Sequence, residues 1–108
     1  MPDFDIDAAL SNPNPLVGAP VYMREGRTGY EVYVRYNRFY HYIGSLEWVS
    51  RTLGIYDCQS PFEVYSRHLS MRESIEHLLT LAGEFLQERP DRFEVSRRSR
   101  LANCTRYA

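Results

Sequence analysis

Hydrophobic and polar residues alternate from Pro20 to Gly44, which is the pattern of half-buried β-strands. Two turn signals divide this stretch, Gly-Arg-Thr-Gly at residues 26–29 and Asn-Arg at residues 37–38. Asn at the first position of a two-residue loop favours a tight hairpin. The pattern therefore predicts three antiparallel strands connected by two hairpins.

The two hairpins predict one common register, and the two faces of the predicted sheet differ in composition. The expected partners are Tyr36–Phe39, Arg35–Tyr40, Val34–His41, Tyr33–Tyr42, Val32–Ile43, Arg24–Glu31, Met23–Val32, Tyr22–Tyr33 and Val21–Val34. One face, expected to be the core, collects Val21, Met23, Val32, Val34, Tyr36, Phe39, His41 and Ile43. The other face collects Tyr22, Arg24, Glu31, Tyr33, Arg35, Tyr40 and Tyr42. A slip of one residue would exchange the faces, so the register is a sharp prediction.

Two short helices are predicted after the sheet. Ser45 is suited to cap a helix over residues 46–53, and Gly54 is suited to end it. Ser60-Pro61-Phe62-Glu63 has the spacing of a capping box, which predicts a second helix over residues 61–69.

The clearest helical pattern runs from Met71 to Arg89. A second capping box, Ser70 with Glu73, marks its start, and Pro90 cannot continue it. Its apolar stripe is expected to cover the core face of the sheet and comprises Met71, Ile75, Leu78, Leu79, Ala82, Phe85 and Leu86. Beyond it, residues 93–95 are expected to form a short strand.

These elements predict an α+β fold: a three-stranded antiparallel sheet followed by three short helices packed mainly on one face. At 108 residues the chain has room for one core. We expect an extended arm at residues 1–19, a single α+β domain at residues 20–95 and a basic tail at residues 96–108.

Composition predicts a cytoplasmic protein without a membrane segment. The first ten residues are acidic and lack the features of a secretory signal, and no stretch approaches the roughly 20 apolar residues of a membrane span. The two cysteines, Cys58 and Cys104, form no recognisable disulfide framework and are expected to be reduced.

Charge is distributed unevenly, and every basic residue is arginine. Residues 1–88 carry a formal charge of −5, and residues 89–108 carry +4. The absence of lysine is explained by codon usage in a GC-rich genome or by the suitability of guanidinium groups for interfaces. It excludes Schiff-base catalysis and a lysine-dependent phosphate loop.

The tyrosine-rich face of the predicted sheet is the leading candidate site. Its tyrosines and arginines would form an amphipathic patch on the order of several hundred Å², a size that usually marks a contact surface. The candidate partner-binding residues are Tyr22, Arg24, Tyr33, Arg35, Tyr40 and Tyr42.

The sequence leaves open which of three occupants covers this patch. Another segment of the same chain could cover it, a partner protein or second copy could bind it, or single-stranded nucleic acid could stack on its rings. The tail arginines Arg97, Arg98 and Arg100 could assist either partner, although such a run is more often simply solvated. The acidic body disfavours nucleic acid.

The histidines and cysteines favour structural interpretations. His41 is expected to be a buried core residue, His68 to end a helix and His77 to form a surface pair with Glu73. Cys58 is expected to be an unactivated loop thiol. The spacing of Cys58, His68, His77 and Cys104 matches no common zinc site, so neither a metal nor a cofactor is expected.

The sequence therefore predicts a non-catalytic protein-binding or inhibitory module that acts through the Tyr/Arg face, with another protein or a second copy as its partner. Small size and the lack of lysine also fit a phage- or mobile-element-encoded inhibitor of a host system. The alternatives are a single-stranded nucleic-acid-binding protein and a small enzyme in which His41 or His68 meets a carboxylate.

Overall fold

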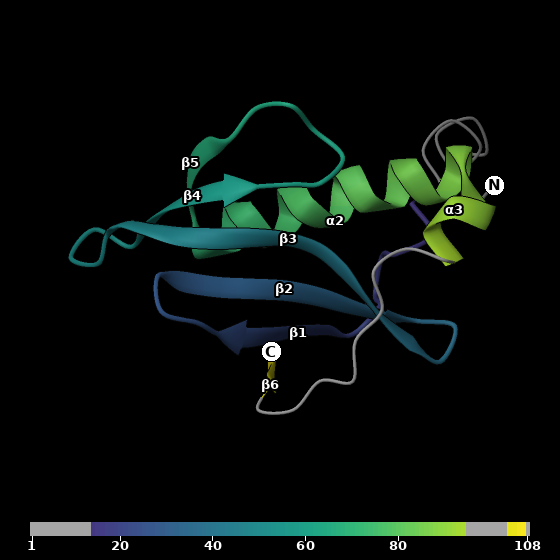
Figure 1. The fold of residues 1–108 in the computed structure, drawn as a ribbon, viewed down its shortest axis with the longest axis horizontal. Helices are drawn as coiled ribbons and strands as arrows, with labels where there is room; N and C mark the ends of the chain where they lie inside the picture. The colour runs from purple at the N-terminus through teal and green to yellow at the C-terminus, as the bar shows by residue number, and fades with distance from the viewer. Residues whose placement is uncertain (1–13, 95–103, 108) are drawn as a thin grey trace, which may run out of the picture.

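The computed structural model describes residues 14–94 and 104–107. Within these residues, a six-stranded antiparallel sheet has the order β5-β4-β3-β2-β1-β6 and is accompanied by one long and one short helix (Figure 1). The strands are β1 (Val21–Glu25), β2 (Gly29–Tyr36), β3 (Phe39–Ser50), β4 (Ile55–Gln59), β5 (Arg67–Ser70) and β6 (Cys104–Tyr107), and the helices are α2 (Met71–Glu88) and α3 (Pro90–Glu94). The prediction of an α+β fold is confirmed, but that of a three-stranded sheet with three helices is wrong.

The predicted register of β1, β2 and the start of β3 is confirmed at every pair except one. The turn at Asn37 and Arg38 has φ angles of 53° and 75°, as a two-residue hairpin loop requires. The exception is Val32, which pairs with Gly44 because a β-bulge makes Ile43 an extra residue. The alternation of polar and apolar residues does not reveal where a bulge inserts an extra residue.

The first predicted helix, residues 46–53, is wrong because β3 continues through this segment to Ser50. Leu46 pairs with Cys58 and Trp48 pairs with Tyr56 on β4, so side chains in this segment also alternate between two faces. Gly54, with φ of 65°, lies in the turn of the β3–β4 hairpin rather than at the end of a helix. Pairing with β4 outweighs the weak capping signal of Ser45.

The second predicted helix, residues 61–69, is also wrong. Ser60 Oγ accepts a hydrogen bond from the backbone N–H of Phe62 at 3.0 Å, which closes a local turn and not a helical one. The chain then forms β5, in which His68 and Leu69 pair with Asp57 and Tyr56 of β4. The capping residues are present, but the segment beyond them joins the sheet.

The prediction of the long helix is confirmed. Both hydrogen bonds of the Ser70–Glu73 capping box are formed. Four residues of the expected stripe are buried, Ile75, Leu78, Ala82 and Leu86, and the other three, Met71, Leu79 and Phe85, pack partly buried against the core. The helix ends before Pro90, which starts α3 as a favoured first residue of a helix. The predicted strand at residues 93–95 is wrong at Phe93, which lies in α3; residue 95 is outside the described part.

The core lies between α2 and the face of the sheet that carries Val32 and Val34. α2 contacts β3, β4 and β5, and α3 lies at its C-terminal end (Figure 1). Leu16, from the segment predicted as an arm, is fully buried, and the Asn14 amide donates to the carbonyl oxygen of Leu79 at 3.4 Å. Residues 104–107, from the segment predicted as a tail, form β6.

No helix among the described residues is long and apolar enough to cross a membrane.

Candidate protein-binding surface on the sheet

The face of the sheet opposite α2, which we call the outer face, carries a row of aromatic side chains. Tyr42, Tyr33 and Tyr22 are register partners on β3, β2 and β1, and Arg106 of β6 continues the row. Arg35 and Tyr40 form the neighbouring row. All six residues predicted for partner binding lie on this face by the alternation of their strands.

The tyrosine rings of the outer face contact one another edge to face. The ring centroids of Tyr22 and Tyr40 are 5.1 Å apart with an interplanar angle of 87°, and those of Tyr33 and Tyr42 are 5.6 Å apart at 67°. This is the favoured arrangement of aromatic pairs, in which a positive ring edge meets a negative ring face. The contacts therefore limit the rotation of four rings.

Arg24 is held inside the face by Glu31 and Tyr33. Its Nε donates to Glu31 Oε1 at 2.8 Å, and a second guanidinium nitrogen also contacts that oxygen. The guanidinium lies 5.7 Å from the centroid of the Tyr33 ring and donates to Tyr33 Oη at 3.3 Å. The hydrogen bond that Arg24 donates to Glu31, with the charges of Tyr33 and Glu31, raises the pKa of Arg24 above its ordinary value. The predicted Arg24–Glu31 pair is confirmed.

The six candidate residues differ in how well they could reach a partner. Tyr33 is only 1% exposed and therefore supports its neighbours rather than presenting a contact area. Tyr22, Arg24, Tyr40 and Tyr42 are half-buried, and Arg35 is exposed. The Arg35 guanidinium lies 5.5 Å from the centroid of the Tyr40 ring, a cation–π contact at the open end of the face.

Sequence reasoning missed β6 and so missed the contribution of Arg106. The only signal was the four-residue segment Cys-Thr-Arg-Tyr, in which Thr and Tyr favour a strand but whose length is too short for a clear period. The tail arginines Arg97, Arg98 and Arg100 lie outside the described residues.

The three histidines have different environments. His41 is fully buried and stacks on Phe93 with ring centroids 4.6 Å apart, which confirms the prediction of a core residue. The predictions for the other two are wrong. His68 lies in β5, with its Nε2 4.0 Å from Asp57 Oδ1, because the segment joins the sheet. His77 contacts Glu63 at 2.8 Å, and not Glu73, because the loop before β5 reaches α2 and Glu73 is used in the capping box.

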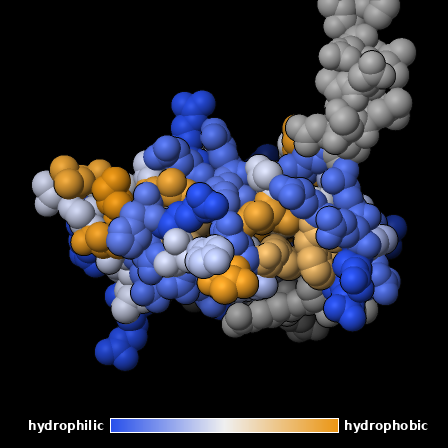
Figure 2. All heavy atoms as spheres, turned by 90° about the horizontal axis from the view of Figure 1, so that it is seen from above, coloured by the Kyte–Doolittle hydropathy of each residue, from blue (hydrophilic) through white to orange (hydrophobic). Residues whose placement is uncertain are grey.

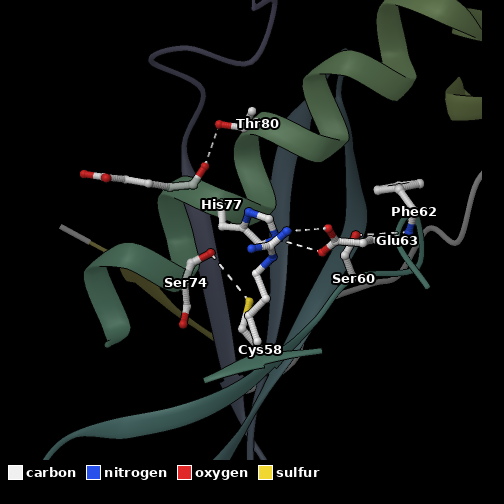
Figure 3. Close-up of polar contacts among 9 residues, drawn as sticks. Cys58, Ser60, Phe62, Glu63, Ser74, His77 and Thr80 are labelled. Atoms are coloured by element: carbon white, nitrogen blue, oxygen red, sulfur yellow. Dashed lines mark hydrogen bonds and ion pairs between the residues drawn. The ribbon is translucent and has the colours of Figure 1, made fainter. Parts of the chain in front are cut away.

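Cys58 lies in β4 and is buried, so its interpretation as a loop thiol is wrong. Its Sγ lies 3.9 Å from the carbonyl oxygen of Ser74 on α2 (Figure 3), and burial raises the pKa of the thiol. A raised pKa reduces the thiolate fraction that a nucleophile needs. Across residues 14–94 and 104–107, no three His, Cys, Asp or Glu side chains gather closely enough to hold a metal ion.

No protein-family model, curated protein or solved structure matches this chain.

Proposed function

We propose that this protein is a non-catalytic protein-binding module that binds a partner protein through the outer face of its sheet. The observation that carries the proposal is the row Tyr42–Tyr33–Tyr22–Arg106 across four adjacent strands. Tyr and Arg are enriched at binding hot spots because they combine a large contact area with directional hydrogen bonds. We further propose that the module is an inhibitor, because a bound module would block the access of other molecules to the same surface of its partner.

The ordered rings support this function through the entropy of binding. Side chains that are immobilised only on binding oppose association. Tyr22 and Tyr40 already contact each other edge to face, and Arg35 already lies over Tyr40. A partner that binds this face would therefore order few additional side chains.

Single-stranded nucleic acid is the alternative occupant of the same face. Tyrosine rings can stack on bases, and Arg35 and Arg106 could contact phosphates. Glu31 opposes this alternative because its carboxylate lies on the same face and engages Arg24. The partner is therefore proposed to be a protein, and weak retention on single-stranded DNA or RNA at low salt is the expected result.

The test compares two neighbouring aromatic positions that face opposite sides of the sheet. A photoreactive phenylalanine analogue replaces Tyr40 on the outer face or, as the control, Phe39, which is 42% exposed on the other face. Irradiation in cells should give a discrete protein adduct from position 40 and none from position 39. Equal adducts at both positions, or adducts only to nucleic acid, would reject the proposal.

A further inference from the structure

The outer face carries positive and negative side chains in two separate places. Arg35 of β2 and Arg106 of β6 are exposed, and we call them the basic side of the face. Glu47 of β3 and Asp57 of β4 are register partners, and we call them the acidic side. Because Cys58 is buried in the core, strand alternation turns Asp57, and with it its partner Glu47, to the outer face.

Ion pairs within the chain do not neutralise these charges. In the part of the chain that the structure describes, Arg35, Arg106 and Glu47 take part in no ion pair. Arg24 and Glu31, on β1 and β2, form an ion pair with each other and so add no net charge to the face. The outer face is therefore dipolar, with a positive and a negative end.

The carboxylate of Asp57 has no charged partner at hydrogen-bonding distance among the described residues. Its Oδ2 accepts a hydrogen bond from the neutral side-chain amide of Gln59 at 3.0 Å. Its Oδ1 is buried and forms no hydrogen bond to these residues, and His68 Nε2 lies 4.0 Å from it. A carboxylate oxygen buried in this way is costly, and a guanidinium brought close to it reduces that cost by Coulomb attraction. The acidic side is therefore suited to receive an arginine from another molecule.

The dipolar face is complementary to itself under a two-fold rotation. Along β2, Arg35 is next to the last residue, whereas Glu47 pairs with the first, Gly29. Across the sheet, Arg106 lies on the edge strand β6, and Asp57 lies on β4, beyond β3. A two-fold axis in the contact plane, near the middle of the sheet, therefore places Arg106 of each copy opposite Glu47 of the other. The same rotation places Arg35 opposite Asp57.

The side of the molecule that Figure 2 shows is less suited to self-association. Viewed from above Figure 1, its hydrophobic atoms form separate groups among hydrophilic ones. Apolar contact on that side would be discontinuous. The outer face combines ordered rings with a self-complementary charge pattern, so it is the better surface for a second copy.

The size of the outer face sets the strength of such a dimer. Six strands spaced ~4.8 Å apart and about 20 Å long cover roughly 600 Å². A standard stable interface buries about 800 Å² on each partner. The dimer is therefore expected to be weak and reversible, with a dissociation constant of about 1 µM or higher.

We propose that the outer face pairs with the outer face of a second copy of this chain, with the basic side of each copy against the acidic side of the other. This inference rests on the proposed function, since it takes the outer face to be a binding surface, and it adds how that surface is regulated. The same face serves both contacts, so self-association and the binding of a different protein exclude each other.

Sedimentation equilibrium of the purified full chain measures this association. At about 50 mM salt, a reversible equilibrium between monomer and dimer is expected, and it should weaken as the salt rises to about 500 mM because charges at the interface are screened. A protein that stays monomeric at every concentration up to about 1 mM would overturn the proposal, as would a dimer that salt does not affect.

An exchange of charges tests which side chains meet. Arg106→Glu and Glu47→Arg should each weaken self-association by about tenfold or more. Mixing the two variants should restore it, because each contact of the mixed dimer then joins one carboxylate to one guanidinium. Arg89→Glu and Glu84→Arg, at exposed positions at the end of α2 and on α2, are the matched controls and should each change it by less than about twofold. A mixture that stays monomeric, or controls that weaken the dimer equally, would overturn the proposal.

The photoreactive analogue at position 40 separates this inference from the proposed function. In the purified protein it should join two copies, whereas the analogue at position 39 should not. If the purified protein is monomeric and position 40 forms an adduct in cells with a different protein, the second copy is rejected and the outer face remains the binding surface. A monomer that forms no protein adduct from position 40 in cells would reject both.

Discussion

Leu78 of α2 lies directly against Gly44 of β3. A Cβ atom added at Gly44 would collide with the Leu78 side chain and with the carbonyl oxygen of Gln59 on the adjoining strand β4. The contact sets how closely the helix approaches the sheet. It occurs at the residue that pairs with Val32 after the bulge, so the bulge places a residue without a side chain under the helix.

Gly44→Ala should destabilise the fold by about 1–3 kcal/mol, the usual cost of overpacking a core. When Leu78→Ala is added to the Gly44→Ala variant, part of the destabilisation caused by Gly44→Ala should be recovered, because Leu78→Ala removes one of the two colliding groups. A double-mutant cycle from urea unfolding measures this coupling. Strictly additive effects of the two substitutions would show that the helix does not rest on Gly44.

Arg38→Gly should stabilise the protein by about 1 kcal/mol. Arg38 has a φ of 75°, a conformation that is costly for a residue with a Cβ atom and free of that cost for Gly. Arg38→Ala is the matched control, since it removes the charge but keeps the Cβ. If Ala stabilises as much as Gly in thermal unfolding, the charge and not the backbone conformation is responsible.

The contacts of the Glu63 carboxylate with His77 and Arg67, which we call the Glu63 clamp, should make stability depend on pH in the acidic range. The pKa of Glu63 is lower in the folded protein than its ordinary value of 4.5, so the unfolded chain binds the proton more readily. The stabilisation that ionised Glu63 gives to the folded protein is therefore complete above the ordinary pKa and is lost as pH falls through the lowered pKa. Glu63→Gln should flatten this part of the curve of unfolding free energy against pH, while Glu84→Gln, at an exposed position on α2, should not. Parallel curves for Glu63→Gln and the unmodified protein would contradict the clamp.

Tyr33→Ala should unfold or strongly destabilise the protein, by about 3–5 kcal/mol, because it empties a fully buried site at the centre of the sheet. Tyr33→Phe should cost only about 0.5–1.5 kcal/mol, the worth of the hydrogen bond between Arg24 and Tyr33 Oη. Chemical denaturation of both variants measures the difference. A stable Tyr33→Ala variant would return Tyr33 to the set of direct contact residues.

The sequence predicted well those elements in which local pattern and tertiary pairing agree. The alternation at residues 20–44 determined which side chains share a face, and the Ser70–Glu73 box with its apolar stripe determined the start and orientation of α2. Both signals are local, so they survive in a single sequence without any knowledge of the neighbours.

The predictions failed where long-range pairing decides the structure. Leu46 and Trp48 fit both a helical stripe and an alternating strand, and only their partners Cys58 and Tyr56 on β4 select the strand. β6 is too short to be recognised before its pairing with β1 is known. For the same reason Arg106 was absent from the predicted surface, and the approach of Glu63 to His77 was not foreseen.

The affinity of the purified protein for the partner identified through position 40 tests the outer-face proposal most directly. Arg35 and Arg27 are both exposed, but Arg35 lies beside Tyr40 on the outer face and Arg27 lies in the turn after β1. Arg35→Glu should weaken binding by more than tenfold, which is about 1.4 kcal/mol, and Arg27→Glu by less than twofold. Equal dissociation constants for the two charge reversals would contradict the proposal that the outer face is the binding surface.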